Sequence, residues 1–416
     1  MNGYMTAHDA AEKWGVTPRQ VQILCKENRI AGASRMSRIW IIPEGAEKPT
    51  GDRKLDNKAK VDLSEAPWKM HEFFAGSGLV AYGLKNIFSP VWANDISEQK
   101  ANVYRANFES RHFELGDIKD VKGAELPFAH LSWASFPCQD LSLAGSMGGI
   151  HASRSGLVWE WLRVLDEMVL QPKILLLENV SGLLSTNGGE NYRILHMALV
   201  DRGYDCGAFL LNASHFVPQS RPRVFIIAVK RGEHIPKELI GDGPCWLHNK
   251  AAIDLGNSLP GWIWWKTEKP EKLKDTLRDI VEQGTPFDKD DVLRLIPDRH
   301  KIKLANLDSV YATGYRRTRN GEQQLELRFD GVAGCLRTPE GGSSKQYLIV
   351  KENGETHARL LTVRETARLM GAPDSYILPG SYNDGYKAMG DAVAMPVANF
   401  IGERFLKKIA EAVYND

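Results

Sequence analysis

The sequence predicts an α/β fold in which a parallel sheet carries helices on both faces. Three observations support this. From residue 68 onward, apolar strand-like segments alternate with helical segments, and short glycine-containing turns separate several of them. The strand-like segments include "KMHEFFAGSG", "PVWANDI", "HFELGDI", "HLSWASFP", "KILLLENV" and "RVFIIAVK", and the longest helical segment is "GLVWEWLRVLDEMVL". Strands that alternate with helices favour a parallel sheet, and such sheets bind ligands at the carboxyl ends of their strands.

The composition is that of an ordinary globular protein. The 416 residues allow roughly two to three domains, and the chain is 43% hydrophobic and 25% charged. No apolar run reaches the ~18 residues of a membrane span, and no secretory signal opens the chain. We therefore expect a cytoplasmic protein without membrane contact. The five cysteines form no C-x-x-C pair, so neither a disulfide framework nor a metal site is expected. A net charge of +1 leaves nucleic-acid binding to local patches.

Residues 1–43 are expected to form a small separate domain. "TAHDAAEKW" has helical spacing, Gly15 breaks it, and "TPRQVQILCKEN" starts a second helix with Thr17 and Gln20 as a capping box. A basic strand, "ASRMSRIWIIP", follows. This order resembles the winged helix-turn-helix domains of the excisionase and MerR-like type. The resemblance implies DNA contacts from Arg19, Gln20, Gln22, Arg35 and Arg38. A small helical protein-interaction module is the alternative.

The rest of the chain divides at changes in composition. Residues 44–67 are polar and charged and are expected to form a linker. Residues 68–230 are expected to form the first part of the core, and residues 346–416 are expected to close it. Between them, residues 231–345 interrupt the rhythm of strands and helices with "GWIWW" and with a hairpin that turns at Asn320-Gly321. The core resumes with a helix whose capping box is Thr362 and Glu365.

Polar and glycine residues stand at three successive strand ends. Gly76 and Gly78 let bare backbone approach a ligand, Asp95 can accept from ribose hydroxyls, and Asp117 can accept from an adenine amino group. Each of these residues alone more often belongs to a turn or a helix cap. Together, in this order, they predict a nucleoside-type cofactor.

Four further residues add reactive chemistry to the same edge of the sheet. Cys138 follows a proline after the strand "HLSWASFP", Glu178 ends a very apolar strand, and Arg221 and Arg223 alternate before another. A thiolate, a proton-donating carboxyl with a raised pKa and two cations would then converge on one crevice. Taken alone, Cys138 reads more simply as a small buried hydrophobe, and Glu178 as an ion-paired strand end.

The ordered motifs resemble those of the DNA cytosine-5 methyltransferase family. They span residues 71–400, and the pair of Pro-Cys-Gln and Glu-Asn-Val motifs is the most specific part. The motifs are "FFAGSGL", "GDI", "FPCQDLS", "LENVSGLL", "QSRPRVF", "RLLTVRETARLMGAPDSY" and "GDAVAMPVANF". The resemblance implies a Rossmann-like, S-adenosylmethionine-dependent methyltransferase core, and an inserted target recognition domain at residues 231–345.

The resemblance also implies a covalent mechanism on cytosine flipped out of duplex DNA. The Cys138 thiolate would attack carbon 6, Glu178 would hold or protonate N3, Arg223 would contact O2, and Arg221 would help order the catalytic loop. S-adenosylmethionine would be the methyl donor. The cofactor residues carried over by this resemblance are Phe74, Ala75, Gly76, Gly78, Asp95, Ile96, Asp117, Ile118, Pro137, Leu157, Asp391 and Val393.

Three positions depart from the family pattern. Glu72 stands where aspartate is usual, Asp95 where glutamate is usual, and Asp391 where asparagine is usual. The last replaces an amide donor by a carboxylate beside the expected cofactor site. Basic residues of the insertion are expected to contact DNA: Arg316, Arg317, Arg319, Arg328, Arg337 and Lys345.

Three functions stay open on the sequence. The first is a sequence-specific DNA cytosine-5 methyltransferase of restriction-modification or phage type, with a cognate restriction endonuclease as a candidate partner and its own promoter as a candidate site for residues 1–43. The second is a tRNA cytosine-5 methyltransferase, and the third is a transcriptional regulator with a vestigial methyltransferase body. The long insertion and the helix-turn-helix pattern favour DNA over tRNA, and the intact Cys138, Glu178, Arg221 and Arg223 disfavour the vestigial form.

Overall fold

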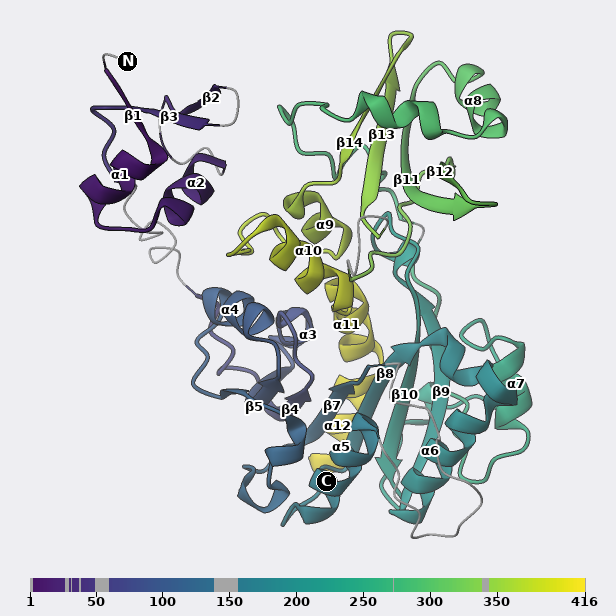
Figure 1. Cartoon of the computed structure of the whole chain (residues 1–416). Helices are drawn as coiled ribbons and strands as arrows, with labels where there is room; N and C mark the ends of the chain where they lie inside the picture. Colours follow the sequence, from purple (N-terminus) through teal and green to yellow (C-terminus); the bar gives the residue numbers. More distant parts are fainter. Residues whose placement is uncertain are drawn as a thin grey trace. The chain divides into compact units, whose positions relative to one another are not determined.

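The computed structural model describes residues 3–26, 30, 32–36, 39–48, 60–137, 156–271, 273–338 and 344–415. They form two compact units, Met1–Ala59 and Lys60–Asp416 (Figure 1). The predicted linker 44–67 is therefore too long at its carboxyl end. Val61 forms a β-bridge with Phe108, and Leu63 and Ala66 are buried in the core of the second unit.

The N-terminal unit has two helices and a three-stranded antiparallel sheet in the order β1-β3-β2. Its elements are β1 (Tyr4–Thr6), α1 (Ala7–Trp14), α2 (Pro18–Lys26), β2 (Ser34–Met36) and β3 (Ile39–Pro43). Gly15 ends α1 with a φ of 64°, a left-handed conformation that glycine adopts readily. The predicted capping box of α2 is present, because the Thr17 amide donates to Gln20 Oε1 and the Gln20 amide donates to Thr17 Oγ1.

A seven-stranded sheet organises the second unit, in the order β6-β5-β4-β7-β8-β10-β9. The strands from β6 to β8 are parallel, and β10 is antiparallel to both of its neighbours. The strands are β4 (Trp68–Phe73), β5 (Phe88–Asp95), β6 (Phe113–Leu115), β7 (Leu131–Ser135), β8 (Ile174–Val180), β9 (Tyr204–Asn212) and β10 (Pro222–Lys230). The parallel part matches the predicted α/β class.

Helices cover both faces of this sheet because its strands are apolar on both sides. In β8, Leu176 packs into one layer while Leu175 and Leu177 pack into the other. One layer contains α5 (Leu157–Glu167) and α6 (Glu190–Asp201). The other contains α3 (Leu79–Leu84), α4 (Glu98–Asn107), α11 (Met395–Ile401) and α12 (Lys407–Tyr414).

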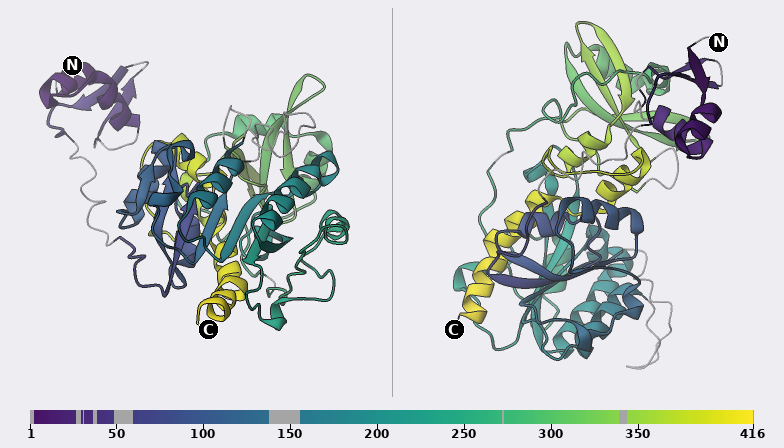
Figure 2. Two further views of the ribbon diagram at one scale, coloured as in Figure 1. Left: turned by 90° about the horizontal axis from the view of Figure 1, so that it is seen from below. Right: turned by 90° about the vertical axis from the view of Figure 1, so that its left-hand side faces the viewer.

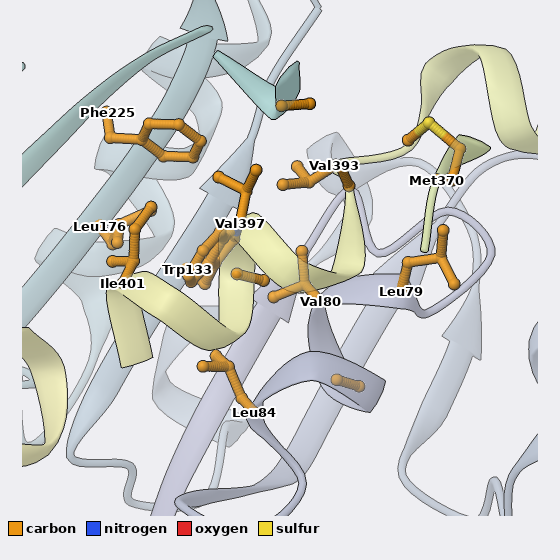
Figure 3. Close-up of a cluster of buried hydrophobic side chains, with 14 of the residues drawn as sticks. Leu79, Val80, Leu84, Trp133, Leu176, Phe225, Met370, Val393, Val397 and Ile401 are labelled. Carbon is orange, nitrogen blue, oxygen red and sulfur yellow. The ribbon is translucent and has the colours of Figure 1, made fainter. Parts of the chain in front are cut away.

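The end of the chain completes the second layer. Figure 3 shows Val397 and Ile401 of α11 between α3 and the strand residues Trp133, Leu176 and Phe225. A Cβ on Gly83 would lie 2.7 Å from the Met395 carbonyl oxygen, so glycine permits this close approach of α3 and α11. The C-terminal residues thus close the core, as the sequence predicts.

A second, four-stranded antiparallel sheet follows, in the order β12-β11-β13-β14. Its strands are β11 (Val310–Arg319), β12 (Glu322–Arg328), β13 (Gln346–Glu352) and β14 (Glu355–Leu360), and α8 (Asp298–Ala305) lies beside them (Figures 1 and 2). The hairpin turns at Asn320 and Gly321, whose φ angles are 51° and 85°. This is the predicted two-residue turn.

Both predicted edges of the insertion differ from the structural ones. The expected division at 345/346 cuts through the four-stranded sheet, which continues to Leu360. The segment after residue 230 still belongs to the seven-stranded sheet: Trp262 forms a β-bridge with Cys206, Trp265 donates from Nε1 to the Ile227 carbonyl, and α7 (Lys250–Gly256) packs nearby. Periodicity alone could not show which sheet these segments join.

The chain leaves the four-stranded sheet through α9 (Val363–Leu369) and α10 (Tyr382–Asp391). The predicted capping box of α9 is present between Thr362 and Glu365. Glu365 is also paired with Arg359 inside the protein, where both side chains are almost fully buried. Across the described part of the chain, no helix is long and apolar enough to span a membrane.

Candidate active site

A cavity of about 500 Å³ lies at the carboxyl ends of β4, β5, β7 and β8. Each of these strands contributes its last residues to the wall, with Phe73, Asp95, Ser135 and Glu178 among them. This is the edge where parallel sheets bind ligands, and the volume lies in the range of small-molecule sites.

The turn between β4 and α3 approaches the cavity in an unusual conformation. Phe74 has a φ of 57° and Gly76 a φ of 58°, and a non-glycine residue rarely occupies this region. The Gly76 amide donates to Asp95 Oδ2 over 2.9 Å, which joins this turn to the end of β5. Asp95 Oδ1 accepts from the Ser97 amide at 2.8 Å. The Asp95 carboxylate is thereby fixed at the cavity wall.

Most of the predicted cofactor residues line this cavity. They are Phe74, Ala75, Gly76, Asp95, Ile96, Asp117, Ile118, Pro137, Leu157, Asp391 and Val393. Gly78 does not line it. A Cβ on Gly78 would lie 2.5 Å from the Phe108 ring and 2.7 Å from the Tyr104 ring, so its missing side chain serves the packing of α3 against α4.

The lining suits S-adenosylmethionine in its chemistry. Phe74, Ile96, Pro137, Leu157 and Val393 supply aromatic and apolar surface for a flat base, and the fixed Asp95 carboxylate can accept from ribose hydroxyls. Glu72 lies at the cavity wall, and neither of its carboxyl oxygens forms a hydrogen bond within the described residues. Burial raises the pKa of Glu72 to about 8. No cluster of metal-ligating side chains occurs in the described ranges.

Glu178 and Arg223 form a buried ion pair beside this cavity. Arg223 Nε lies 3.0 Å from Glu178 Oε1, and the two side chains are 17% and 9% exposed. The pair forms because antiparallel β10 passes β8, which places Phe225 opposite Glu178 and Arg223 opposite Val180. Burial raises the pKa of Glu178, although Arg223 and Arg221 oppose the shift. The carboxyl can therefore hold a proton more readily than an exposed one.

Arg221 is buried and connects three segments. Its guanidinium donates to the carbonyl oxygens of Leu336, Gly390 and Ala392, and it contacts Cys335 Sγ at 3.3 Å. Burial, with the neighbouring Arg223, lowers its pKa to about 10. Arg221 therefore holds the segment that follows β12 and the end of α10 against the core.

Cys138 lies outside the described residues, which stop at Pro137 and resume at Gly156. Pro137 lines the cavity, and Asn179 Nδ2 donates to the Phe136 carbonyl, so the segment leading to Cys138 is held against the end of β8. Ser135 pairs with Glu178 in the sheet register. The predicted nucleophile thus follows directly from the strand beside the predicted acid.

The expected DNA-contacting residues fall into two groups. In the N-terminal unit, Arg19, Gln20 and Gln22 are exposed on α2, Arg35 lies in β2, and Arg38 is outside the described residues. In the second unit, Arg317 and Arg337 lie against the Tyr315 ring at 5.1 and 6.0 Å.

Four more of these residues make contacts within the second unit. Arg316 lies over Tyr347, Arg319 is paired with Glu326, Arg328 is paired with Asp330, and Lys345 donates to Asn383. Among the described residues, Arg317 and Arg337 beside Tyr315 and the exposed face of α2 thus offer polar and basic surfaces of the kind expected for DNA contacts.

Sequence reasoning missed several residues of the cavity wall. Lys100 lies inside α4, Thr338 lies in the segment between β12 and β13, and Asn94 holds β6 through hydrogen bonds to the Glu114 and Gly116 carbonyls. Asn94 stands in the quoted segment "PVWANDI", but only Asp95 of that segment was expected at the site. The charge of Lys100 offered the one usable signal. Lys100 lies about one helical turn after Asp95, which ends the preceding strand.

Together, the fold and the cavity define an α/β enzyme core that binds a nucleoside cofactor. A model of the C-5 cytosine-specific DNA methylase family matches residues 68–407, and the chain belongs to this family. It is a DNA cytosine-5 methyltransferase that uses S-adenosylmethionine. The family match leaves residues 1–67 outside.

Curated relatives cover most of the chain at modest identity. The type II methyltransferase M.Bsp6I of Bacillus sp. (strain RFL6) is 26% identical over 343 residues, covering 81% of this chain and 98% of that protein. M.SsoII of Shigella sonnei is 26% identical over 387 residues, covering 90% of both. M.HhaI of Haemophilus parahaemolyticus is 26% identical over 343 residues, covering 79% of this chain and 91% of that protein.

Solved structures share the fold. The Dnmt2 methyltransferase of S. pombe has a TM-score of 0.52 at 20% identity, covering 81% of this chain and 98% of that one. A putative DNA modification methyltransferase from an E. coli prophage has a TM-score of 0.51 at 21% identity, covering 84% and 100%. At these identities the likeness is evidence for the fold alone.

Proposed function

We propose that the chain methylates carbon 5 of a flipped-out cytosine in a specific duplex DNA sequence through a covalent bond to Cys138. The observation that carries this proposal is the buried Glu178–Arg223 pair, which lies beside the cofactor cavity and next to the strand that leads to Cys138. The names of the relatives, type II methyltransferases, support a place in a restriction-modification system with a cognate endonuclease.

The residues would act in sequence on the cytosine ring. The Cys138 thiolate attacks carbon 6, and the electrons move toward N3, where the Glu178 carboxyl holds the proton. Arg223 keeps Glu178 oriented and contacts the ring oxygen. Carbon 5 thereby becomes nucleophilic. S-adenosylmethionine, when bound, supplies an electrophilic methyl group. Loss of the carbon-5 proton and of the bond to Cys138 then restores the aromatic ring.

The test compares substrates and a variant. The protein is incubated with labelled S-adenosylmethionine and either duplex DNA or tRNA, and then with duplex DNA containing 5-fluorocytosine. We expect label in duplex DNA and a denaturation-resistant adduct, because fluorine cannot leave as a proton does. Cys138→Ala should give neither, since a methyl side chain cannot form the bond to carbon 6. Label in tRNA alone, or an active Cys138→Ala protein, would overturn the proposal.

The four-stranded sheet and the segment that follows β12 are proposed as the target recognition domain. The segment runs from Arg337 to Thr338 directly over Gly390, where a Cβ would lie 2.8 Å from the Arg337 backbone. Thr338 donates to Asp391 at the cavity wall. Arg337 and Thr338 would thus join the surface that contacts bases to the cofactor cavity. Bisulfite sequencing of DNA from cells that express the protein would reveal the target sequence.

The N-terminal unit is proposed to bind a second DNA site, its own promoter being the first candidate. α2 follows α1 after the Gly15 turn and exposes Arg19, Gln20 and Gln22. The M.SsoII match covers 90% of the chain, more than residues 60–416 make up, so it extends into this unit. A protein that begins near Lys60 should keep methylation and lose promoter protection in a footprint. A folded but inactive truncation would contradict this division.

A further inference from the structure

Lys100 and Asp391 form an ion pair on the wall of the cofactor cavity. Lys100 Nζ lies 2.8 Å from Asp391 Oδ2, and the side chains are 22% and 35% exposed. Lys100 comes from α4, after β5, while Asp391 is the last residue of α10, nearly three hundred positions further along the chain. The pair therefore joins the two halves of the catalytic core at the place where the cofactor binds.

Neighbouring groups fix both partners. The Thr338 hydroxyl donates to the other Asp391 oxygen, Oδ1. The Lys100 stem runs past Gly76, where its Cδ would lie 3.9 Å from an added Cβ. Burial opposes the charge on Lys100, but the carboxylates of Asp391 and Asp95 outweigh it and raise the pKa of Lys100. Lys100 is therefore a cation at neutral pH, held between two acidic residues of the cavity.

The methyl donor and its product differ by one charge. S-adenosylmethionine carries a sulfonium cation that S-adenosylhomocysteine lacks, while both share the adenosine and the amino-acid group. In a cavity of about 500 Å³, any bound group lies within about 10 Å of the lining charges, a distance at which Coulomb interactions are still felt in a partly buried site. A carboxylate on the wall favours the donor, and a cation beside it reduces that preference.

We infer that Asp391 and Lys100 act in opposite directions on the preference of the cavity for the cationic donor over the neutral product, and that they balance each other in the intact ion pair. Asp391 favours the sulfonium form, and Lys100 offsets this effect. The inference rests on the proposed placement of S-adenosylmethionine in this cavity.

The test measures dissociation constants of both ligands by titration calorimetry, with the full chain at low salt and without DNA. Asp391→Asn should reduce the preference for S-adenosylmethionine over S-adenosylhomocysteine about three- to tenfold, because Lys100 is left uncompensated. Lys100→Met should increase that preference by a similar factor. The double variant should return close to the wild-type ratio.

A matched ion pair at the opposite end of β8 provides the control. Lys173 Nζ lies 3.0 Å from Glu233 with side chains 39% and 25% exposed, and Lys173 precedes the first residue of β8 while the cavity lies at its other end. Lys173→Met and Glu233→Gln should leave the ratio unchanged. Thermal unfolding measured without ligand shows whether each variant is folded.

Two results would overturn the inference. A parallel change in both dissociation constants would mean that Lys100 contacts the shared amino-acid group or only holds the wall in shape. An equal change in the control variants would mean that net charge of the whole protein is responsible. If wild-type protein binds neither ligand, the proposed cofactor site itself is wrong, which is a separate outcome.

Discussion

Charged side chains are buried at the carboxyl ends of the parallel strands of the seven-stranded sheet and are more exposed on the β11–β12 hairpin of the four-stranded sheet. Glu178 and Arg221 are 7% and 2% exposed, and each is fixed by neighbours from other elements. On β11, the Arg319 side chain is 58% exposed and its partner Glu326 is 22% exposed.

The difference separates two kinds of function within one unit. A buried charge requires compensating partners, so its neighbours on several elements are constrained with it. An exposed charge requires few partners and can be exchanged with little effect on folding. Chemistry common to a family suits the first arrangement, and recognition of one DNA sequence suits the second.

The largest effect is expected at the buried end. Glu178→Gln keeps the shape but cannot exchange a proton, so the single-turnover rate of methyl transfer should fall at least about 100-fold. Because burial raises the pKa of Glu178, the wild-type rate should decline as pH rises through that pKa, and the residual rate of the variant should lack this limb. Rates measured from pH 5 to 9 test both points.

If the single-turnover rate of Glu178→Gln lies within about tenfold of the wild-type rate, the buried carboxyl at the end of this sheet is not the group that handles the proton. Thermal unfolding of Glu178→Gln controls for misfolding. The comparison between the two sheets would then lose its chemical basis.

A stability effect is expected from Glu72, which is fully buried with a pKa raised to about 8 by desolvation. The folded state holds the proton more tightly than the unfolded chain, whose ordinary pKa is 4.5. Stability from this group is therefore complete below about pH 4.5 and is lost as pH rises through 8.

Glu72→Gln removes this dependence. Relative to the variant, the wild type should lose on the order of a few kcal/mol of unfolding free energy between pH 5 and pH 9. Denaturant unfolding of both proteins at pH 5, 7 and 9 measures the difference. A constant difference across this range would show that Glu72 finds a partner that ionisation does not disturb.

The contrast also explains what the sequence could predict. Strand ends such as "NDI" and "LENV" identified Asp95 and Glu178 because an acid after an apolar run stands out. Lys100 was missed because a lysine inside a helix looks like solvated surface until α10 brings Asp391 to it. Gly78 was assigned to the cavity because G-x-G spacing does not distinguish an approach to a ligand from the packing of Tyr104 and Phe108.

Domain edges were misplaced for a related reason. Residues 346–360 alternate like strands of either sheet, and only their pairing with β11 assigns them to the smaller one. Residues up to about 280 pack on the larger sheet through Trp265 and Leu277, although their sequence has no regular period. Long-range pairing decides both edges, and no local pattern encodes it.

The smallest effect is expected from an exposed arginine that already has a partner. Arg317 and Arg319 alternate on one face of β11, but Arg317 lies against the Tyr315 ring while Arg319 is paired with Glu326 through two hydrogen bonds. If the face near Tyr315 reads DNA, Arg317→Ala should weaken specific binding by about 1–3 kcal/mol and relax the choice of one base. Arg319→Ala should change affinity by less than about fivefold, because an exposed pair contributes at most ~1 kcal/mol. Gel-shift titrations of both variants on target and non-target duplexes decide between them, and equal losses would mean that the whole arginine face contributes only non-specific phosphate attraction.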